Sequence, residues 1–278
     1  MTVHRISTHL HDGLRFDVKD EGPKSGEVVL LLHGFPQTSS CWDAVVPLLN
    51  AQGYRTIALD QRGYSPGARP RGRWSYRTDL LVADVVSLIE RVGAPVHLVG
   101  HDWGAVVSWG VSVARPDLVR THTSVSVPHP AAFVKSFLTS RQLLRSWYIL
   151  FFQLPVLPEL VITRVPGVFA RLLASSGMDA ELFERVQAEI VESGALSPAI
   201  GYYRGLLLSP GAARGRSRVP TTHVWSSGDS ALDRAGAELC GDYVRAPYRL
   251  EVMEGASHWI PDQEPQRLAE IIGERARG

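Results

Sequence analysis

Asp102 stands at the centre of the stretch with the clearest chemical signal, Gly100-His101-Asp102-Trp103-Gly104. An apolar run over residues 96–99 predicts a buried strand before it, and apolar residues from 105 to 114 predict a helix after it. Small residues two positions to either side of a central side chain are typical of a nucleophile elbow, because a Cβ there would collide with the neighbouring elements. Asp102 is therefore a candidate nucleophile. The alternative is an aspartate that only caps the following helix.

A nucleophile of this kind needs a general base, and His258 has the position of one. Around such an elbow the nucleophile, the acid and the histidine follow one another along the chain. Of the ten histidines, only His258 lies after the last predicted strand, residues 248–253, and before the final predicted helix, residues 264–275. His33 and His101 lie in turns, and we expect them to have structural roles. No histidine belongs to an HExxH or similar signature, so we expect no metal and no other cofactor.

The acid of the triad follows by elimination. On folds with such an elbow it comes after one of two strands, here those predicted over residues 120–127 and 221–226. No Asp or Glu occurs over residues 118–158, which removes the first strand. Asp229 comes shortly after the second strand and is the candidate. Asp233 is the alternative, but it falls in a helical pattern, and we expect it to face solvent.

Alternating strands and helices must position these residues. Strand-like runs are predicted over residues 2–10, 14–19, 27–32, 54–59, 96–100, 120–127, 221–226 and 248–253. Helical patterns separate most of these runs, so we expect βαβ crossovers. The predicted fold is a mostly parallel eight-stranded sheet covered by helices on both faces.

A block of helical patterns interrupts the alternation after residue 127. The helices of this block are predicted over residues 131–140, 143–152, 167–175, 179–192 and 198–208. We therefore expect a core domain of residues 1–127 and 219–278 and an inserted helical lid of residues 128–218. Because ligands of such sheets bind at the carboxyl ends of the strands, the lid would cover the site.

Composition excludes several other classes of function. The chain has 278 residues and a formal net charge of +1, which gives no sign of binding to nucleic acid or to a charged membrane surface. Cys41 and Cys240 show no CxxC or zinc-site spacing, so we expect two reduced thiols. No apolar run is long enough to be a transmembrane segment, and residues 1–13 do not resemble a signal peptide. These features predict a cytoplasmic protein.

The sequence resembles the epoxide hydrolases of the α/β-hydrolase family. The matching pieces are His33-Gly34-Phe35-Pro36, Gly100-His101-Asp102-Trp103-Gly104, Gly228-Asp229 and His258-Trp259. The resemblance implies the α/β-hydrolase fold, a cis peptide bond between Phe35 and Pro36, and two tyrosines in the lid. Tyr148 resembles the first of these tyrosines and Tyr203 the second. Tyr202 competes with Tyr203, but neighbours on a helix point about 100° apart, so only one can serve.

The resemblance implies hydrolysis of a lipophilic epoxide to a vicinal diol. A carboxylate suits displacement at a saturated carbon, because the alkyl ester formed on Asp102 keeps its carbonyl on the enzyme for attack by water. His258, held by Asp229, would activate that water, and the lid tyrosines would protonate the epoxide oxygen. Backbone N–H groups of Phe35 and Trp103 would form the oxyanion hole. We expect the substrate to contact Phe35, Pro36, Trp103, Trp147, Phe151 and Trp259.

The main alternative is a haloalkane dehalogenase with the same Asp-His-Asp triad. Halide binding needs two N–H donors: Trp103 would supply one, and Trp147 is the candidate for the second because Phe35 has no side-chain donor. A haloacid dehalogenase would need arginines beside the elbow, where Ala105 and Val106 stand instead. A hydrolase fold without activity, serving as a binding module, is a third interpretation. A homodimer formed through the lid also stays open.

Overall fold

The computed structural model describes residues 4–209 and 215–278. Its strands are β1 (Thr8–His11), β2 (Leu14–Glu21), β3 (Val28–Leu32), β4 (Arg55–Leu59), β5 (Val96–His101), β6 (Val119–Val125), β7 (Thr221–Ser226) and β8 (Tyr248–Met253). They form one eight-stranded sheet in the order β1-β2-β4-β3-β5-β6-β7-β8. The pairs β1–β2 and β2–β4 are antiparallel, and the remaining pairs are parallel. The predicted sheet is therefore confirmed, although residues 2 and 3 of the first predicted strand lie outside the described residues.

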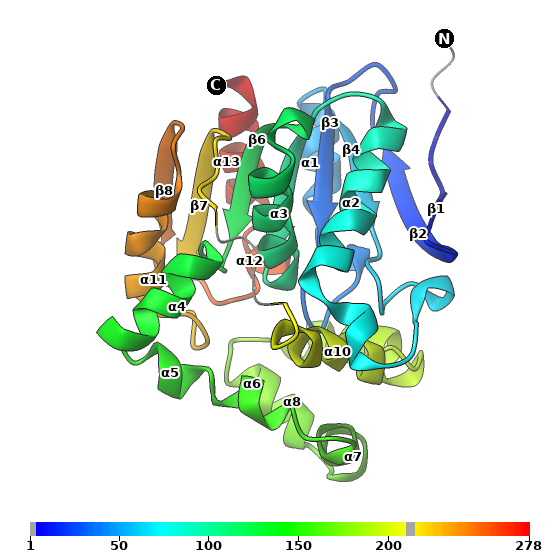
Figure 1. The fold of residues 1–278 in the computed structure, drawn as a ribbon, viewed down its shortest axis with the longest axis vertical. Helices are drawn as coiled ribbons and strands as arrows, with labels where there is room; N and C mark the ends of the chain where they lie inside the picture. The colour runs from blue at the N-terminus through cyan, green and yellow to red at the C-terminus, as the bar shows by residue number, and fades with distance from the viewer. Residues whose placement is uncertain (1–3, 210–214) are drawn as a thin grey trace.

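The apolar side chains of strand β3 pack into the apolar clusters on both faces of the sheet. All of its residues are buried. Leu30 and Leu32 belong to the apolar cluster that includes α2 and α3, whereas Val29 and Leu31 belong to the cluster that includes α1 and α13. Successive side chains of a strand point to opposite faces, so helices can cover both sides of the sheet. Figure 1 shows α2 and α3 on one side and α1 and α13 on the other.

The helices of the core connect these strands. They are α1 (Val46–Ala51), α2 (Thr78–Val92), α3 (Trp103–Ala114), α11 (Arg234–Leu239), α12 (Ile260–Gln263) and α13 (Pro265–Arg277). Helix α2 ends at Gly93, which adopts the left-handed conformation that closes many helices. No helix in the described part of the chain is both long and apolar enough to cross a membrane.

Between β6 and β7 the described residues form helices and no strand. These helices are α4 (Pro130–Thr139), α5 (Gln142–Arg145), α6 (Trp147–Phe151), α7 (Leu157–Arg164), α8 (Val168–Ala174), α9 (Ala180–Val186) and α10 (Leu196–Leu206). A π-helical turn, Gln187–Glu192, continues α9. The helices α4 to α8 lie along the lower edge of the molecule in Figure 1. Phe35, which follows β3, packs against Phe152 and Tyr203, so this block meets the sheet at the carboxyl end of a central strand.

The helical block differs from the sequence prediction in three places. The helix predicted over residues 143–152 is divided into α5 and α6 at Ser146, whose hydroxyl accepts a hydrogen bond from the Gln142 amide. The sequence does not predict α7, because prolines interrupt the pattern; Pro158 nevertheless fits the first turn of a helix, where no N–H is needed. The helix predicted over residues 179–192 changes from α9 to the π-helical turn.

Candidate active site

Asp102 lies in the sharp turn between β5 and α3. Its φ of 51° and ψ of −117° are unusual for a residue with a side chain, and such strain is typical of functional turns. A Cβ on Gly104 would collide with the carbonyl oxygen of Leu32, and a Cβ on Gly100 with that of Gly104. The carboxylate accepts no hydrogen bond from an N–H group of α3 beyond Trp103, its first residue, so the interpretation as a helix cap alone is wrong. The predicted elbow is present at the carboxyl end of a central strand.

Asp102, His258 and Asp229 come together from three separate loops, those after β5, β8 and β7. His258 Nδ1 lies 2.7 Å from Asp229 Oδ2, and His258 Nε2 lies 3.7 Å from Asp102 Oδ2. The second Asp229 oxygen accepts the backbone N–H groups of Ala231 and Leu232 at 2.8 and 3.0 Å. Nδ1–H therefore donates to a fixed carboxylate, and Nε2 faces the candidate nucleophile.

Asp233, the alternative acid, lies outside this group. Its carboxylate accepts the backbone N–H of Ala235 and caps α11, which is the ordinary role of an aspartate at a helix start. The geometry thus favours Asp229 over Asp233 as the partner of the imidazole.

Burial and nearby charges shift the pKa values of His258, Asp102 and Asp229 in opposite directions. Burial lowers the pKa of His258, but the Asp229 carboxylate and then the Asp102 carboxylate outweigh it and raise that pKa to about 9. Burial raises the pKa of Asp102, opposed by the nearby His258 and by hydrogen bonds from the N–H groups of Phe35 and Trp103. Burial acts against ionised Asp229 too, yet His258 and two backbone N–H groups hold its pKa below the ordinary value. The imidazolium is therefore stabilised between two carboxylates.

Backbone N–H groups surround the other side of the Asp102 carboxylate. The Phe35 N–H donates to Asp102 Oδ1 at 2.7 Å, and the Trp103 N–H faces the same carboxylate. The Phe35–Pro36 peptide bond is cis, as the resemblance implies. Oδ1 thus occupies the place where an oxyanion would be held, which leaves Oδ2 as the oxygen on the His258 side.

Two phenols from the helical block lie near this carboxylate. The rings of Tyr148, on α6, and Tyr203, on α10, have centroids 5.9 Å apart. The Tyr203 ring also packs edge-on against Trp103 at 5.0 Å and against Phe35 at 5.3 Å. Burial raises the pKa of both phenols well above the ordinary value, and the charge of Asp102 adds to the rise in both. Both side chains therefore stay protonated at neutral pH.

The neighbouring aromatic residues of the two helices point elsewhere. Tyr202 donates its hydroxyl to the carbonyl oxygen of Arg62 at 2.7 Å, so it faces the core and Tyr203 faces Tyr148. Trp147 is 54% exposed, because it precedes an inward-facing Tyr148 on the same short helix. The structure does not bring Trp147 to the site, neither as a substrate contact nor as a halide donor.

The other residues predicted to contact the substrate differ in how they lie relative to Asp102. Phe35 and Pro36 are buried beside Asp102, and Phe151 is half-buried against Phe152. Trp259 is buried under the triad: its ring packs edge-on against His258 at 5.0 Å, and its indole N–H donates to the Ser176 hydroxyl. We therefore assign Trp259 to the support of His258 and not to substrate contact.

Polar contacts that the sequence does not predict fix the loop around Phe35. Glu189, in the π-helical turn, accepts hydrogen bonds from the hydroxyls of Thr38 at 2.6 Å and Ser40 at 2.7 Å. On the inner side, His33 Nε2 accepts the Gln61 N–H at 3.1 Å, so His33 has a structural role. Single polar residues far apart in sequence carry no pattern, and no sequence signal identifies these pairs.

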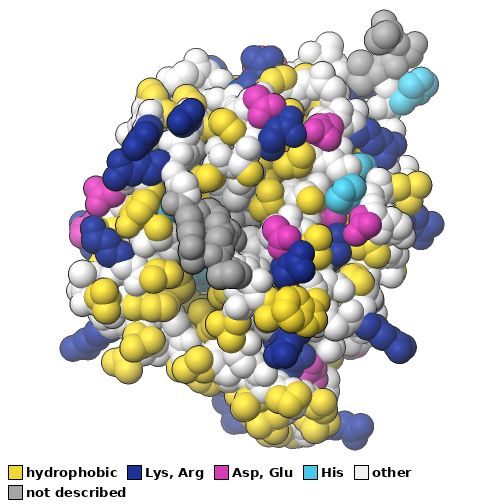
Figure 2. Space-filling model, in the orientation of Figure 1, with side chains coloured by type: hydrophobic (Ala, Val, Ile, Leu, Met, Phe, Trp, Pro, Cys, Tyr) yellow, Lys and Arg dark blue, Asp and Glu magenta, His cyan; other side chains and the backbone are white. Residues whose placement is uncertain are grey.

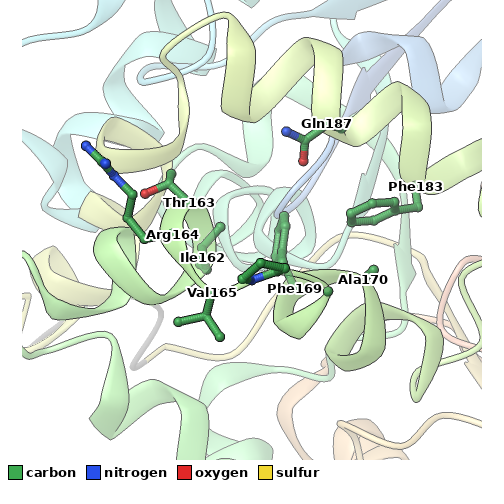
Figure 3. A pocket seen from close by; sticks show the side chains of 10 residues that line it. Ile162, Thr163, Arg164, Val165, Phe169, Ala170, Phe183 and Gln187 are labelled. Carbon is green, nitrogen blue, oxygen red and sulfur yellow. The ribbon is translucent and has the colours of Figure 1, made fainter.

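A surface pocket of about 260 Å³ lies between α7, α8 and α9, lined in part by exposed residues (Figure 3). Ile162, Phe169 and Phe183 line it and pack in the same apolar cluster as Trp103 and Tyr203. In the described part of the chain, no group of three or more His, Cys, Asp or Glu side chains is arranged to hold a metal ion.

Known proteins are similar to this chain in sequence. Residues 29–271 match the model of the Alpha/beta hydrolase family. Epoxide hydrolase 3 from Xenopus tropicalis is 34% identical over 94% of this chain and 74% of its own length. Epoxide hydrolase 4 from Homo sapiens is 30% identical over 96% of this chain and 78% of its own length.

Solved structures agree with the sequence relatives. One structure, of a novel epoxide hydrolase of the alpha/beta hydrolases superfamily from metagenomes of hot environments, is 26% identical. It covers 100% of both chains with a TM-score of 0.85. The chain therefore belongs to the alpha/beta hydrolase family and, within it, is related to the epoxide hydrolases.

Proposed function

We propose that this chain is an epoxide hydrolase that converts a lipophilic epoxide into a vicinal diol through a covalent ester on Asp102. One observation carries the proposal: an elbow carboxylate lies beside a buried imidazole and near two protonated phenols, Tyr148 and Tyr203. The names of the relatives support the same activity. A serine at the elbow would instead suit attack on an acyl carbon.

In the first step, Asp102 Oδ2 attacks a carbon of the epoxide ring. A C–O ester bond forms and the ring C–O bond breaks, so negative charge develops on the epoxide oxygen. Tyr148 and Tyr203 hold that oxygen, and one of them gives it a proton and becomes a phenolate. An unassisted alkoxide would be a far poorer leaving group, and a positioned proton donor contributes about 10²–10⁴-fold.

In the second step, water attacks the carbonyl carbon of the Asp102 ester while His258 Nε2 takes a proton from it. The N–H groups of Phe35 and Trp103 stabilise the tetrahedral oxyanion. Collapse breaks the bond between that carbon and the alkyl oxygen, which restores the Asp102 carboxyl group. Of the two protons that water supplies, one reaches the released alkoxide and the other returns to the phenolate. The diol therefore keeps an oxygen that came from Asp102.

The charge on Asp102 changes the pKa of His258 between the two steps. With Asp102 ionised, the pKa of His258 is raised to about 9 and the imidazole is protonated at neutral pH. Esterification removes one of the two negative charges that raise this pKa, so it falls. The imidazole can then lose its proton to solvent and serve as the base, and it takes a proton back from solvent once the Asp102 carboxylate is restored.

We further propose that residues 128–218 act as the lid of the site and select a lipophilic substrate. The apolar cluster that includes Trp103, Phe152 and Tyr203 supports this role, since it would surround a bound epoxide with aromatic rings. The lid supplies the proton donors, whereas the core domain of residues 1–127 and 219–278 supplies the nucleophile and the base. A cytoplasmic location stays a prediction.

Product analysis distinguishes this function from its alternatives. We expect an aryl-substituted epoxide to give one equivalent of diol by chromatography, and a primary haloalkane to release no halide. Halide release without diol formation would make the chain a haloalkane dehalogenase. Saturable binding of either compound without turnover would make it a binding module.

A further inference from the structure

The outer surface of α4 to α7 holds most of the exposed apolar side chains. Fourteen large apolar side chains are exposed in the described part of the chain, and eleven of them lie between Val134 and Val165. We call these eleven Leu, Val and Trp side chains the lid patch. Leu138 is 89% exposed, Leu144 73% and Leu150 69%. Isolated exposed apolar residues are ordinary, but a concentration of this kind marks an interaction surface.

The lid patch is accompanied by positive charge. Residues 118–158 contain no Asp or Glu, and Glu159 is paired with Arg204 at 2.7 Å. Arg141 and Arg164 are exposed within the patch, and no ion pair is described for either of them. Figure 2 shows Lys and Arg side chains among the hydrophobic side chains along the lower edge of the molecule. The net charge of the whole chain conceals this local excess.

The helices that carry the patch turn apolar side chains outward. On α6, Tyr148 faces the site, whereas Trp147 and Leu150 are exposed. Outward Leu and Trp side chains beside basic residues are the kind of surface that enters the headgroup region of an anionic bilayer. The same charges disfavour a second copy of this chain as the occupant, because a twofold interface would bring identical basic patches together.

From these observations we propose that the lid patch docks onto an anionic lipid surface, with its Leu and Trp side chains in the headgroup region and Arg141 and Arg164 on the lipid phosphates. The proposal does not depend on the chemistry of the site, because it uses only the outer face of the lid.

Vesicle sedimentation of the full chain tests the proposal. We expect the protein to sediment with vesicles of phosphatidylcholine and phosphatidylglycerol, more weakly with phosphatidylcholine alone, and less at high salt. The triple variant Leu138→Ser/Leu144→Ser/Leu150→Ser should lose about tenfold in binding. A matched control, Leu10→Ser/Trp74→Ser/Leu207→Ser, removes three exposed side chains elsewhere and should bind as the parent does.

A charge variant and a folding check complete the experiment. Arg141→Glu/Arg164→Glu should lose the preference for anionic vesicles and keep the weaker binding to phosphatidylcholine. Thermal melts by circular dichroism compare the variants with the parent, so that unfolding is not mistaken for lost binding. The proposal is overturned if the parent binds no vesicle, or if the control loses as much binding as the lid variant. It is also overturned if the lid substitutions abolish a concentration-dependent dimer and leave vesicle binding unchanged.

Discussion

The three triad side chains and the two lid phenols are held in different ways. Asp102 and Asp229 each accept hydrogen bonds from backbone N–H groups of loops at the carboxyl ends of strands, and His258 bonds to Asp229 at 2.7 Å. Tyr148 and Tyr203 are oriented mainly by aromatic packing. Backbone contacts fix an oxygen to one place, whereas packed rings can adjust to what lies between them.

The two phenols also differ from each other. Helix α10 is tied to the core, since Tyr202 donates to the Arg62 carbonyl. The Tyr203 ring packs against Phe35 and Trp103 of the core, whereas the Tyr148 ring packs against Phe152 and Tyr203 of the helical block. The Tyr148 ring is therefore one ring contact further from the core than the Tyr203 ring. We infer that the core determines the reaction and the lid adapts to the substrate.

The largest effect is expected in the core, at Asp102. Asp102→Ala should lower diol formation by about 10⁴-fold or more, because no other carboxylate can reach the substrate from this position. The measurement is steady-state turnover of an epoxide. Asp233→Asn, which changes a capping carboxylate at α11, is the matched control and should keep full activity.

His258→Gln should separate the two steps. Turnover should fall by about 10²–10⁴-fold, since the water loses its base. The ester should then accumulate, and the intact mass of the protein should rise by the mass of one epoxide. A variant that is inactive but never gains this mass would place His258 in the first step and contradict the division between the steps.

The lid phenols should show smaller and unequal effects. Tyr203→Phe and Tyr148→Phe should each slow ester formation by about tenfold, the value of one hydrogen bond, and the double variant should lose more. Because Tyr148 is held less directly, its effect should vary more between small and bulky epoxides. Rapid-mixing kinetics with two substrates measure this difference. Equal effects with every substrate would remove the distinction between the two helices.

The pH dependence of kcat tests the charges around His258. Water attack needs neutral imidazole, so kcat should rise as the pH increases through the pKa of His258 in the ester, which lies below the value of about 9 in the resting site. Asp229 raises this pKa, so Asp229→Asn should move the acidic limb of the profile to lower pH, besides lowering kcat. An unchanged limb would mean that another group controls it.

The smallest effect is expected where the lid meets the core. Glu189→Gln keeps acceptors for Thr38 and Ser40 but removes the charge, so stability should fall by about 1 kcal/mol while kcat changes little. Denaturant titration measures the loss. Ser193, whose hydroxyl donates to the Glu189 carbonyl, offers a control in Ser193→Ala, which should leave the Thr38 and Ser40 contacts intact.

Local patterns explain which features could be predicted from the sequence. The elbow needs small residues at fixed positions, and β3 needs a continuous apolar run, so both are visible in the chain. Asp229 could be found because a long acid-free segment left few candidates. Each of these features depends on residues close together in sequence or on their order.

Features that depend on contacts between distant segments could not be predicted. The orientation of Trp147 depends on which side of α6 meets α10. Glu189 meets Thr38 across 151 positions of the chain, and neither residue belongs to a motif. The lid patch could not be predicted because only the folded structure shows which apolar side chains are exposed. The net charge of +1 describes the whole chain and does not reveal a local excess of positive charge.

A single turnover in ¹⁸O-labelled water tests most directly whether Asp102 is the nucleophile. With enzyme in excess over epoxide, the first diol should contain no label, because its new oxygen comes from Asp102. Mass spectrometry of the peptide that contains Asp102 should then show one ¹⁸O atom in its carboxylate. Full label in the first diol, with an unlabelled peptide, would mean that water attacks the epoxide directly and would contradict the covalent mechanism.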